Sequence, residues 1–185
     1  MYTAAKKSLA FVLSILMLLG CTLQIVAADT DRLPDPPASC VYDPVGVIEA
    51  ETEQEINQAS NALYALSGAQ IVVVAVDKTG YSDLSKYADD LFNDWKIGSK
   101  EQNNGVLFVM EISTYKYWAA LGQGLEKTVT SAVLQRIFDS GMETAFDQAQ
   151  YDRAAKIFCE KMTETLEQIY NVDTKSWDGV TFHYG

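Results

Sequence analysis

The sequence is poor in histidine, and it has no proline beyond its first quarter. Its one histidine is His183, near the C-terminus, and the last of its four prolines is Pro44. Zinc sites and serine–histidine–aspartate triads depend on imidazole side chains, so both kinds of site are poorly supported here. Because proline interrupts helices and central strands, its absence after Pro44 favours continuous secondary structure.

Positive charge is also scarce. The chain has 14 lysines and arginines against 25 acidic side chains, and its formal net charge is −11. Nucleic acids and anionic lipid surfaces are bound mainly by cationic side chains. We therefore expect no nucleic acid partner, and contact with a membrane only through the N-terminal segment. An acidic chain is compatible with binding of hard cations such as Ca²⁺ or Mg²⁺.

Residues 1–28 have the pattern of a secretory signal peptide. Two lysines precede an apolar core, Leu9–Leu19, and Val26-Ala27-Ala28 offers a small-residue cleavage site. Two alternatives stay open. The run Leu18-Leu19-Gly20-Cys21 resembles a bacterial lipobox, which would make Cys21 a lipidation site. The whole apolar segment is also close to the length of an uncleaved membrane anchor. All three predict that the rest of the chain lies outside the cytoplasm.

Residues 29–40, DTDRLPDPPASC, form a proline-rich linker, because prolines favour extended backbone over helix. The linker ends at Cys40, and the body of the chain holds one other cysteine, Cys159. In an oxidising compartment the two could form a disulfide if the fold brings them together. The alternative is that each is a buried thiol.

Strand and helix patterns alternate from residue 41 to residue 170, and residues 171–185 form a tail. The patterns predict strands at Val41–Gly46, Ile71–Val76, Val106–Ile112 and Tyr115–Leu121, and a short β-prone piece at Val180–Tyr184. They predict helices that run from near Glu49 to Gly68, from a cap at Ser82 to Gly98, from Ala132 to near Gly141, and from Tyr151 to Tyr170.

Two of the expected strands, Ile71–Val76 and Val106–Ile112, are apolar runs without alternation, as is typical of strands covered on both faces. The helix between them makes a crossover, so these strands should be parallel. The short break Ser113-Thr114 predicts an antiparallel hairpin with Tyr115–Leu121. The chain should therefore have an α/β fold with a small mixed sheet, made of parallel core strands and an antiparallel hairpin.

Candidate metal ligands adjoin the ends of the expected strands or turns. Asp43 and Asp77 follow strands, and Asn104 precedes one. Carboxylate and amide oxygens suit Ca²⁺ or Mg²⁺, and such an ion could polarise a phosphoryl oxygen. The alternative is structural: Asp43 caps the following turn, Asp77 ends a strand, and Asn104 tolerates left-handed backbone.

A second candidate site consists of glycines at the two ends of the expected hairpin. Gly105 opens it, and Gly122-Gln123-Gly124 closes it. Successive backbone N–H groups at such glycines can form an anion-binding nest. A tight exit from the strand is the alternative. The hairpin also carries Tyr115, Tyr117 and Trp118, which would form a binding patch if exposed, although we expect helices to cover them.

Four segments in this order resemble the TPM-domain family: VYDPVGVIEAETEQEI, SGAQIVVVAV, YADDLFNDWKIGSKEQNNGVLFVMEI and ALGQGLEKTVT. The resemblance covers roughly residues 41–170. It implies an α/β/α sandwich that is usually extracytoplasmic and often beside a membrane. Some members resemble acid phosphatases, and others act as assembly or repair factors. Where the family often has an aspartate after the Gly-x-Gly segment, this chain has Ser131.

The resemblance and the residues together predict an extracytoplasmic binding module with an envelope or membrane protein as partner. The alternative function is a metal-assisted acid phosphatase that acts on phosphomonoesters through Asp43, Asp77 and Asn104. The replacement of the family aspartate by Ser131 and the shortage of histidine favour the binding module.

Overall fold

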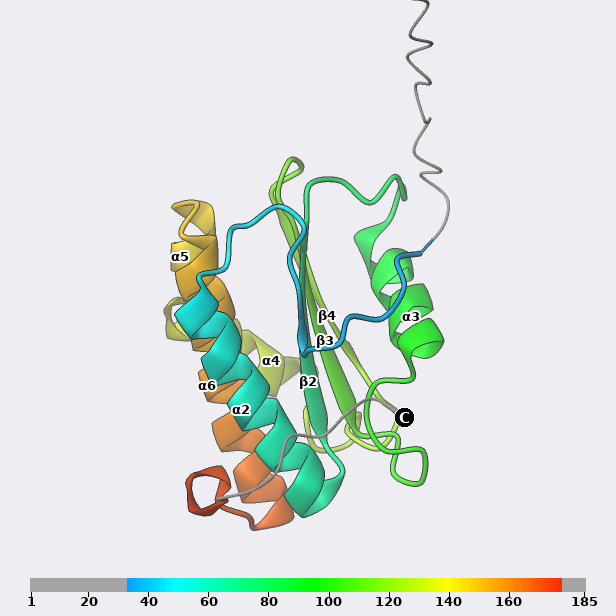
Figure 1. Ribbon diagram of the computed structural model, residues 1–185, viewed down its shortest axis with the longest axis vertical. Coiled ribbons are helices and arrows are strands. Elements are labelled where there is room, and N and C mark those ends of the chain that lie inside the picture. Colours follow the sequence, from blue (N-terminus) through cyan, green and yellow to red (C-terminus); the bar gives the residue numbers. More distant parts are fainter. Residues whose placement is uncertain (1–32, 178–185) are drawn as a thin grey trace, which may run out of the picture. The chain divides into compact units, whose positions relative to one another are not determined.

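The sheet at the centre of the structure has its strands in the same order as the sequence. This computed structural model describes residues 33–177 (Figure 1). The strands are β1 (Val41–Tyr42), β2 (Gln70–Val76), β3 (Gly105–Glu111) and β4 (Lys116–Leu121). The β1–β2 and β2–β3 pairs are parallel and the β3–β4 pair is antiparallel. The predicted mixed sheet, with parallel core strands and an antiparallel hairpin, is confirmed.

Helices cover both faces of this sheet, which makes three layers (Figure 1). One face packs against α2 (Ala50–Ser67), α4 (Ser131–Ile137), α5 (Glu143–Asp147) and α6 (Tyr151–Tyr170). The other face packs against α3 (Leu84–Trp95) alone among the described helices. Every residue of β3 is buried. The apolar runs of β2 and β3 therefore serve two hydrophobic cores, one on each side of the sheet.

The larger core is built from aromatic rings that β3 and the helices contribute. Phe108 of β3 stacks on Phe158 of α6, with their ring centroids 4.1 Å apart. Tyr117 of β4 meets Phe138 and Phe146 edge to face, at 5.2 and 5.0 Å. Such ring pairs contribute roughly 0.5–1.5 kcal/mol each beyond the burial of their area. The hairpin is thereby fastened to the C-terminal helices.

The boundaries of α2 and α6 and the end of the third helix agree with the expected ones, whereas the start of α3 differs. Helix α3 is capped by Asp83, whose carboxylate accepts from the Ser85 N–H at 2.9 Å, and not by Ser82. The third helix ends near Gly141 as expected, because the segment η1 (Phe138–Met142) that joins α4 to α5 is kinked at this glycine. Gly141 lies inside that segment with φ of 112°, which glycine adopts without a side-chain clash. The predictions for α2 and α6 are confirmed, including the left-handed Gly68 that ends α2.

The first two residues of the described part of the proline-rich linker, residues 33–40, contact the folded body. The indole Nε1 of Trp95 donates to the carbonyl oxygen of Pro34 at 2.8 Å, and Leu33 packs on the α3 side of the sheet. Residues 1–32 and 178–185 are outside the described part of the chain, so the signal peptide, Cys21 and the expected strand Val180–Tyr184 stay predictions.

A buried amide fixes the N-terminal end of β3. Asn104 is fully buried, and its Nδ2 donates to the Ser67 carbonyl at 3.2 Å and to the Tyr170 hydroxyl at 3.0 Å. Its Oδ1 accepts from the Ser99 N–H at 3.2 Å. This one side chain therefore ties the last residue of α2, the last residue of α6 and the loop before β3 together.

Replacement of Asn104 by alanine should lower the free energy of unfolding by about 2–3 kcal/mol, because it removes a fully buried side chain and its hydrogen bonds to the part-buried Ser67 and Tyr170. Urea unfolding of the variant beside wild type measures this loss. Asn93→Ala is the matched control, since Asn93 is exposed on α3 and should change stability by less than about 0.5 kcal/mol. Equal effects of the two substitutions would contradict this role for Asn104.

Candidate functional site

The three predicted metal ligands do not share one end of the sheet. In the β2–β3 register Gln70 pairs with Gly105 and Val76 pairs with Glu111. Asn104 therefore lies beside the start of β2, whereas Asp77 follows its end. At about 3.3 Å per residue the two are on the order of 25 Å apart. One ion needs ligands within about 2.6 Å, so the expected grouping of Asn104 with the aspartates is wrong.

Asp43 and Asp77 follow neighbouring parallel strands and so lie at the same edge of the sheet, but both carboxylates have other partners. The two oxygens of Asp43 accept from the N–H groups of Gly46 and Ile48, at 2.9 and 2.7 Å. Asp77 accepts from the hydroxyl of Ser113. Within residues 33–177 no three histidine, cysteine, aspartate or glutamate side chains form a group that could hold a metal ion. A cation at Asp43 and Asp77 stays a prediction.

The hairpin glycines allow close approach of backbone segments. A Cβ atom on Gly105 would lie 2.2 Å from the carbonyl oxygen of Ile97, and one on Gly122 or Gly124 would lie 2.1 or 1.9 Å from a carbonyl oxygen of the loop before β3. The N–H groups of Gly122 and Gly124 donate to Gly105 and Asn103, each at 2.9 Å. These two N–H groups are already bonded within the protein, so they are not free to bind an anion. The predicted anion nest of Gly105, Gly122, Gln123 and Gly124 therefore draws little support from the structure.

A buried carboxylate that the sequence reasoning missed lies at the C-terminal end of β3. Glu111 is 4% exposed, and its Oε1 accepts from both the N–H and the hydroxyl of Thr79, at 2.6 and 2.7 Å. Its Oε2 accepts from the hydroxyl of Thr114. An acidic residue inside the apolar run VLFVMEI was the available signal, because a buried charge needs such partners.

The pKa of Glu111 reports on these bonds. Burial raises the pKa, but the hydrogen bonds from Thr114 and Thr79, together with the charge of Lys116, outweigh it and leave the pKa below its ordinary value. Hydrogen bonds to the ionised form stabilise that form. Glu111 is therefore a carboxylate that joins the segment before α3 to the β3–β4 turn.

That turn presents two aromatic side chains to solvent. Tyr115 is 71% exposed and Trp118 is 45% exposed. Tyr115 lies in the turn itself, with φ of 53°, and not in the strand as expected. The expected helix cover is absent for these two, whereas Tyr117 packs inward and donates to Glu143 at 2.9 Å. A hollow of about 340 Å³ separates them from the start of α3. We call Tyr115, Lys116, Trp118 and this hollow the aromatic surface.

The two body cysteines are buried in the same core. Cys40 precedes β1, and Cys159 lies on α6. Burial, followed by the proximity of Cys40, raises the pKa of the Cys159 thiol. Both are thiols in the structure, so the disulfide between Cys40 and Cys159 stays a prediction.

Ser131, which stands where the family often has aspartate, is the first residue of α4. Its position places it beyond the Gly-x-Gly segment, at the start of a seven-residue helix. Neither Asp43 nor Asp77 has a hydrogen bond or ion pair with it among the interactions of the described residues.

The sheet and the helices on both of its faces define an α/β/α domain with a mixed sheet. Comparison with known proteins identifies the family to which this domain belongs. The TPM domain matches residues 41–165 of this sequence. The chain belongs to the TPM-domain family. A search of curated proteins found no match.

Three solved structures of bacterial proteins are similar. The N-terminal domain of a P. gingivalis protein has 21% sequence identity and a TM-score of 0.64, over 72% of this chain and 85% of that one. The N-terminal domain of the cg2496 protein of Corynebacterium glutamicum has 16% identity and a TM-score of 0.55, over 83% and 93%. The BA42 protein of the psychrophile Bizionia argentinensis has 20% identity and a TM-score of 0.56, over 75% and 95%. At these identities the likeness shows the fold alone.

None of the helices within residues 33–177 combines the length and the apolar character needed to cross a bilayer.

Substitution of Glu111 by glutamine should cost about 1–2 kcal/mol at neutral pH, because charge-assisted hydrogen bonds become neutral ones. Since the pKa of Glu111 in the folded state is below its ordinary value of 4.5, the contribution of the charge is complete above pH 4.5 and is lost as pH falls through the folded-state pKa. Urea unfolding of both proteins from pH 7 to pH 3 should show the gap closing in acid. A gap independent of pH would contradict this assignment.

Replacement of Asp43 by alanine should destabilise the protein by about 1–2 kcal/mol whether or not Ca²⁺ is present, because two backbone N–H groups lose their acceptor. Thermal unfolding with Ca²⁺ and with a chelator measures both conditions. A loss confined to the Ca²⁺ sample would instead assign Asp43 to a cation site.

Proposed function

We propose that this protein is an extracytoplasmic module that binds a protein partner at the cell envelope, in an assembly or maintenance role, and that the aromatic surface is the contact. The observation that carries the proposal is the exposure of Tyr115 and Trp118 beside one hollow. Tyrosine and tryptophan are enriched where protein interfaces concentrate their binding energy.

The backbone at Tyr115 supports the proposal. A non-glycine residue with φ of 53° occupies the left-handed region, which costs roughly 1–2 kcal/mol. Such conformations persist where the surroundings hold them, and they cluster at functional sites. Here the hydroxyl of the neighbouring Thr114 is held by Glu111, and the Tyr115 N–H donates to Ile112 at 3.3 Å. The turn is therefore fixed before a partner arrives, which reduces the entropy lost on binding.

The position of β4 adds a second contribution. It is one of the two edge strands of the described sheet, with β1 at the other edge, and its N-terminal half, from Lys116 to Trp118, is the more exposed half. An edge strand leaves backbone N–H and C=O groups that can pair with an extended segment of another protein. A partner that inserts a side chain into the hollow and pairs with β4 would use both features.

The alternative, a metal-assisted acid phosphatase, draws less support. Its three residues, Asp43, Asp77 and Asn104, lie at two ends of the sheet, and both aspartate side chains accept hydrogen bonds from the protein itself. Ser131 also stands in place of the family aspartate. We therefore favour the binding module.

Capture of an envelope fraction from the source cells on immobilised protein tests the proposal. The double variant Tyr115→Ser, Trp118→Ser should weaken binding of the captured partner by at least about thirtyfold, as expected for two interface hot spots of roughly 2 kcal/mol or more in total. Both side chains are exposed, so the fold should be unaffected.

Tyr64→Ser is the matched control, because Tyr64 is a 36% exposed aromatic on α2, away from the aromatic surface. It should leave binding unchanged. A partner that binds the double variant as tightly as wild type would sink the assignment of this surface.

A further inference from the structure

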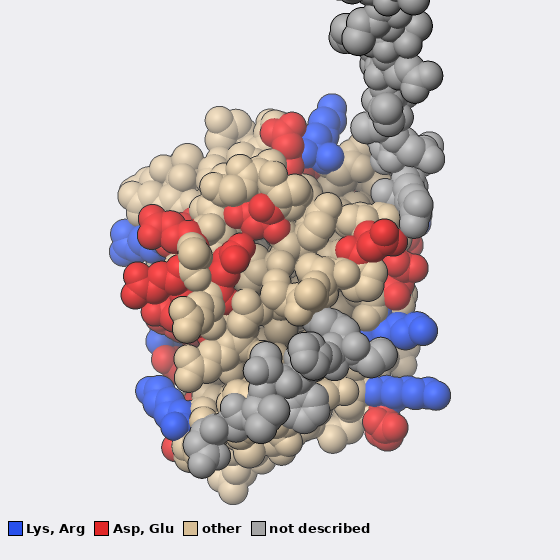
Figure 2. All heavy atoms as spheres, viewed as in Figure 1, with Lys and Arg blue, Asp and Glu red and all other residues tan. Residues whose placement is uncertain are grey.

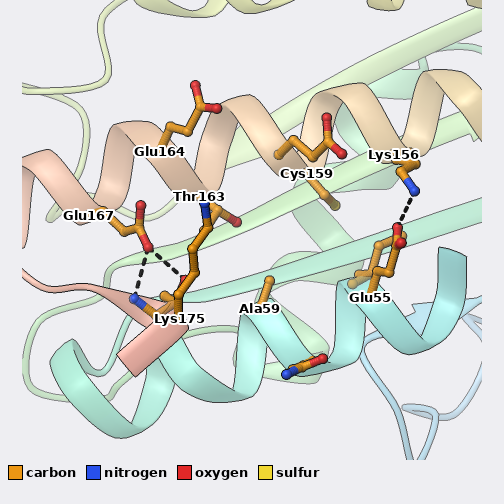
Figure 3. Close-up of a pocket in the computed structure, with 12 residues that line it drawn as sticks. Glu55, Ala59, Lys156, Cys159, Thr163, Glu164, Glu167 and Lys175 are labelled. Atoms are coloured by element: carbon orange, nitrogen blue, oxygen red, sulfur yellow. Dashed lines mark hydrogen bonds and ion pairs between the residues drawn. The ribbon is translucent and has the colours of Figure 1, made fainter. Parts of the chain in front are cut away.

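A groove of about 530 Å³ runs between α2 and α6, on the helical layer that covers the other face of the sheet from α3 (Figure 3). It is separate from the aromatic surface. Its charged lining consists of four carboxylates and two lysines: Glu55, Glu160, Glu164, Glu167, Lys156 and Lys175. Figure 2 shows acidic side chains gathered over the part of the surface where Figure 1 places the N-terminal half of α2.

A buried hydroxyl group in the groove lacks a partner. Thr163 of α6 is 8% exposed, and its Oγ1 has no hydrogen bond within residues 33–177. It lines the groove together with the sulfur-bearing side chain of Cys159 and the methyl group of Ala59 (Figure 3). An unsatisfied buried hydroxyl costs about 1–3 kcal/mol, so it calls for an explanation.

The acidic side chains follow one line along α6. Glu160, Glu164 and Glu167 are spaced at i, i+4 and i+7, which places them on one side of the helix over roughly 10 Å. The carboxylate of Glu167 is held by Thr174, whose N–H and hydroxyl donate at 2.8 and 2.6 Å. Across the groove Glu55 forms an ion pair with Lys156. Glu164 pairs with Lys161 at 2.8 Å. Within residues 33–177 the groove carboxylates without an ion pair are therefore Glu160 and Glu167, above an apolar floor.

The protein itself supplies a guide to what fits. Figure 3 shows the Lys175 side chain extending from the short helix η2 (Thr174–Ser176) across the groove in the direction of Thr163. No carboxylate among the described residues lies within 4.0 Å of its ammonium group. A flexible alkylammonium thus already occupies part of the groove without an ion pair to hold it. An external amine could displace it and reach carboxylates on α6.

We propose that the α2–α6 groove binds an aliphatic primary amine of the diamine or polyamine class. The ammonium groups bond to the α6 carboxylates, since charge-assisted bonds of this kind are the strong ones. The methylene chain lies on Ile56 and Ala59, which removes apolar surface from water. One ammonium group donates to the Thr163 hydroxyl oxygen, which gives this buried atom its missing partner.

Isothermal titration of the full chain with putrescine and with spermidine tests the proposal, beside the diol that has the carbon chain of putrescine. Both amines should bind and the diol should not. Thr163→Val keeps the shape and removes the hydroxyl, so it should weaken amine binding about tenfold or more. Thr165→Val is its matched control. The Thr165 hydroxyl donates to the backbone carbonyl oxygen of Lys161 and lies outside the α2–α6 groove.

Two further pairs of variants distinguish amine binding in the groove from general electrostatic attraction of amines to an acidic protein. Glu160→Gln should weaken binding, whereas Glu101→Gln, in an exposed loop, makes the same charge change and should have little effect. Lys175→Ala should strengthen binding by vacating the groove, whereas the exposed Lys100→Ala should not.

Equal effects within each pair would overturn the proposal, and so would absence of amine binding. Binding of Mg²⁺ that depends on Glu160 but not on Thr163, with no binding of either amine, would mark a metal site instead and also overturn it.

Discussion

The hydrogen bonds of the Glu111 carboxylate hold the part of the molecule that we assign to function. A charge that is 4% exposed is costly unless its oxygens are bonded, and here Thr79 and Thr114 satisfy them. The two threonines belong to different segments, one before α3 and one in the β3–β4 turn. The same carboxylate therefore sets the start of α3, the turn and the hollow between them. It also holds Thr114, the neighbour of Tyr115, and the backbone at Tyr115 is left-handed.

A buried polar side chain lies at each end of β3, Asn104 at the N-terminal end and Glu111 at the C-terminal end, and the two have different structural roles. At the N-terminal end the Asn104 amide ties helix ends to a loop, on a side where close glycine contacts leave little room for a ligand. At the C-terminal end the Glu111 carboxylate leaves a turn with exposed aromatic side chains. The same apolar strand thus separates a structural end of the sheet from an end that faces a partner in our proposal.

The sheet and the long helices could be predicted because their signals are local. The apolar runs of β2 and β3 and the pattern of α6 are explicit in the sequence. The end of the third helix near Gly141 could also be predicted, because this glycine takes a positive φ of 112° that interrupts the helix. The error over Asn104 was avoidable, since a residue before one parallel strand cannot lie beside a residue that follows its neighbour.

The candidate sites depend on packing, which the sequence does not state. Whether Trp118 is covered depends on how far α3 extends over β4, which the strand pattern does not state, and our expectation of helix cover was wrong. The α2–α6 groove joins Thr163 to Lys175 through a turn after α6 whose path no periodicity predicts. The exposure of Trp118 and the lack of a hydrogen-bond partner for the Thr163 hydroxyl within residues 33–177 are both consequences of tertiary structure, and the two proposals depend on them.

Hydrogen–deuterium exchange of the full chain, with and without the solubilised envelope partner, tests the central claim most directly. Our account predicts slower exchange in peptides that cover the β3–β4 turn and the N-terminal half of β4, with no change in α2. Unchanged exchange at the turn, together with protection elsewhere in the domain, would contradict it.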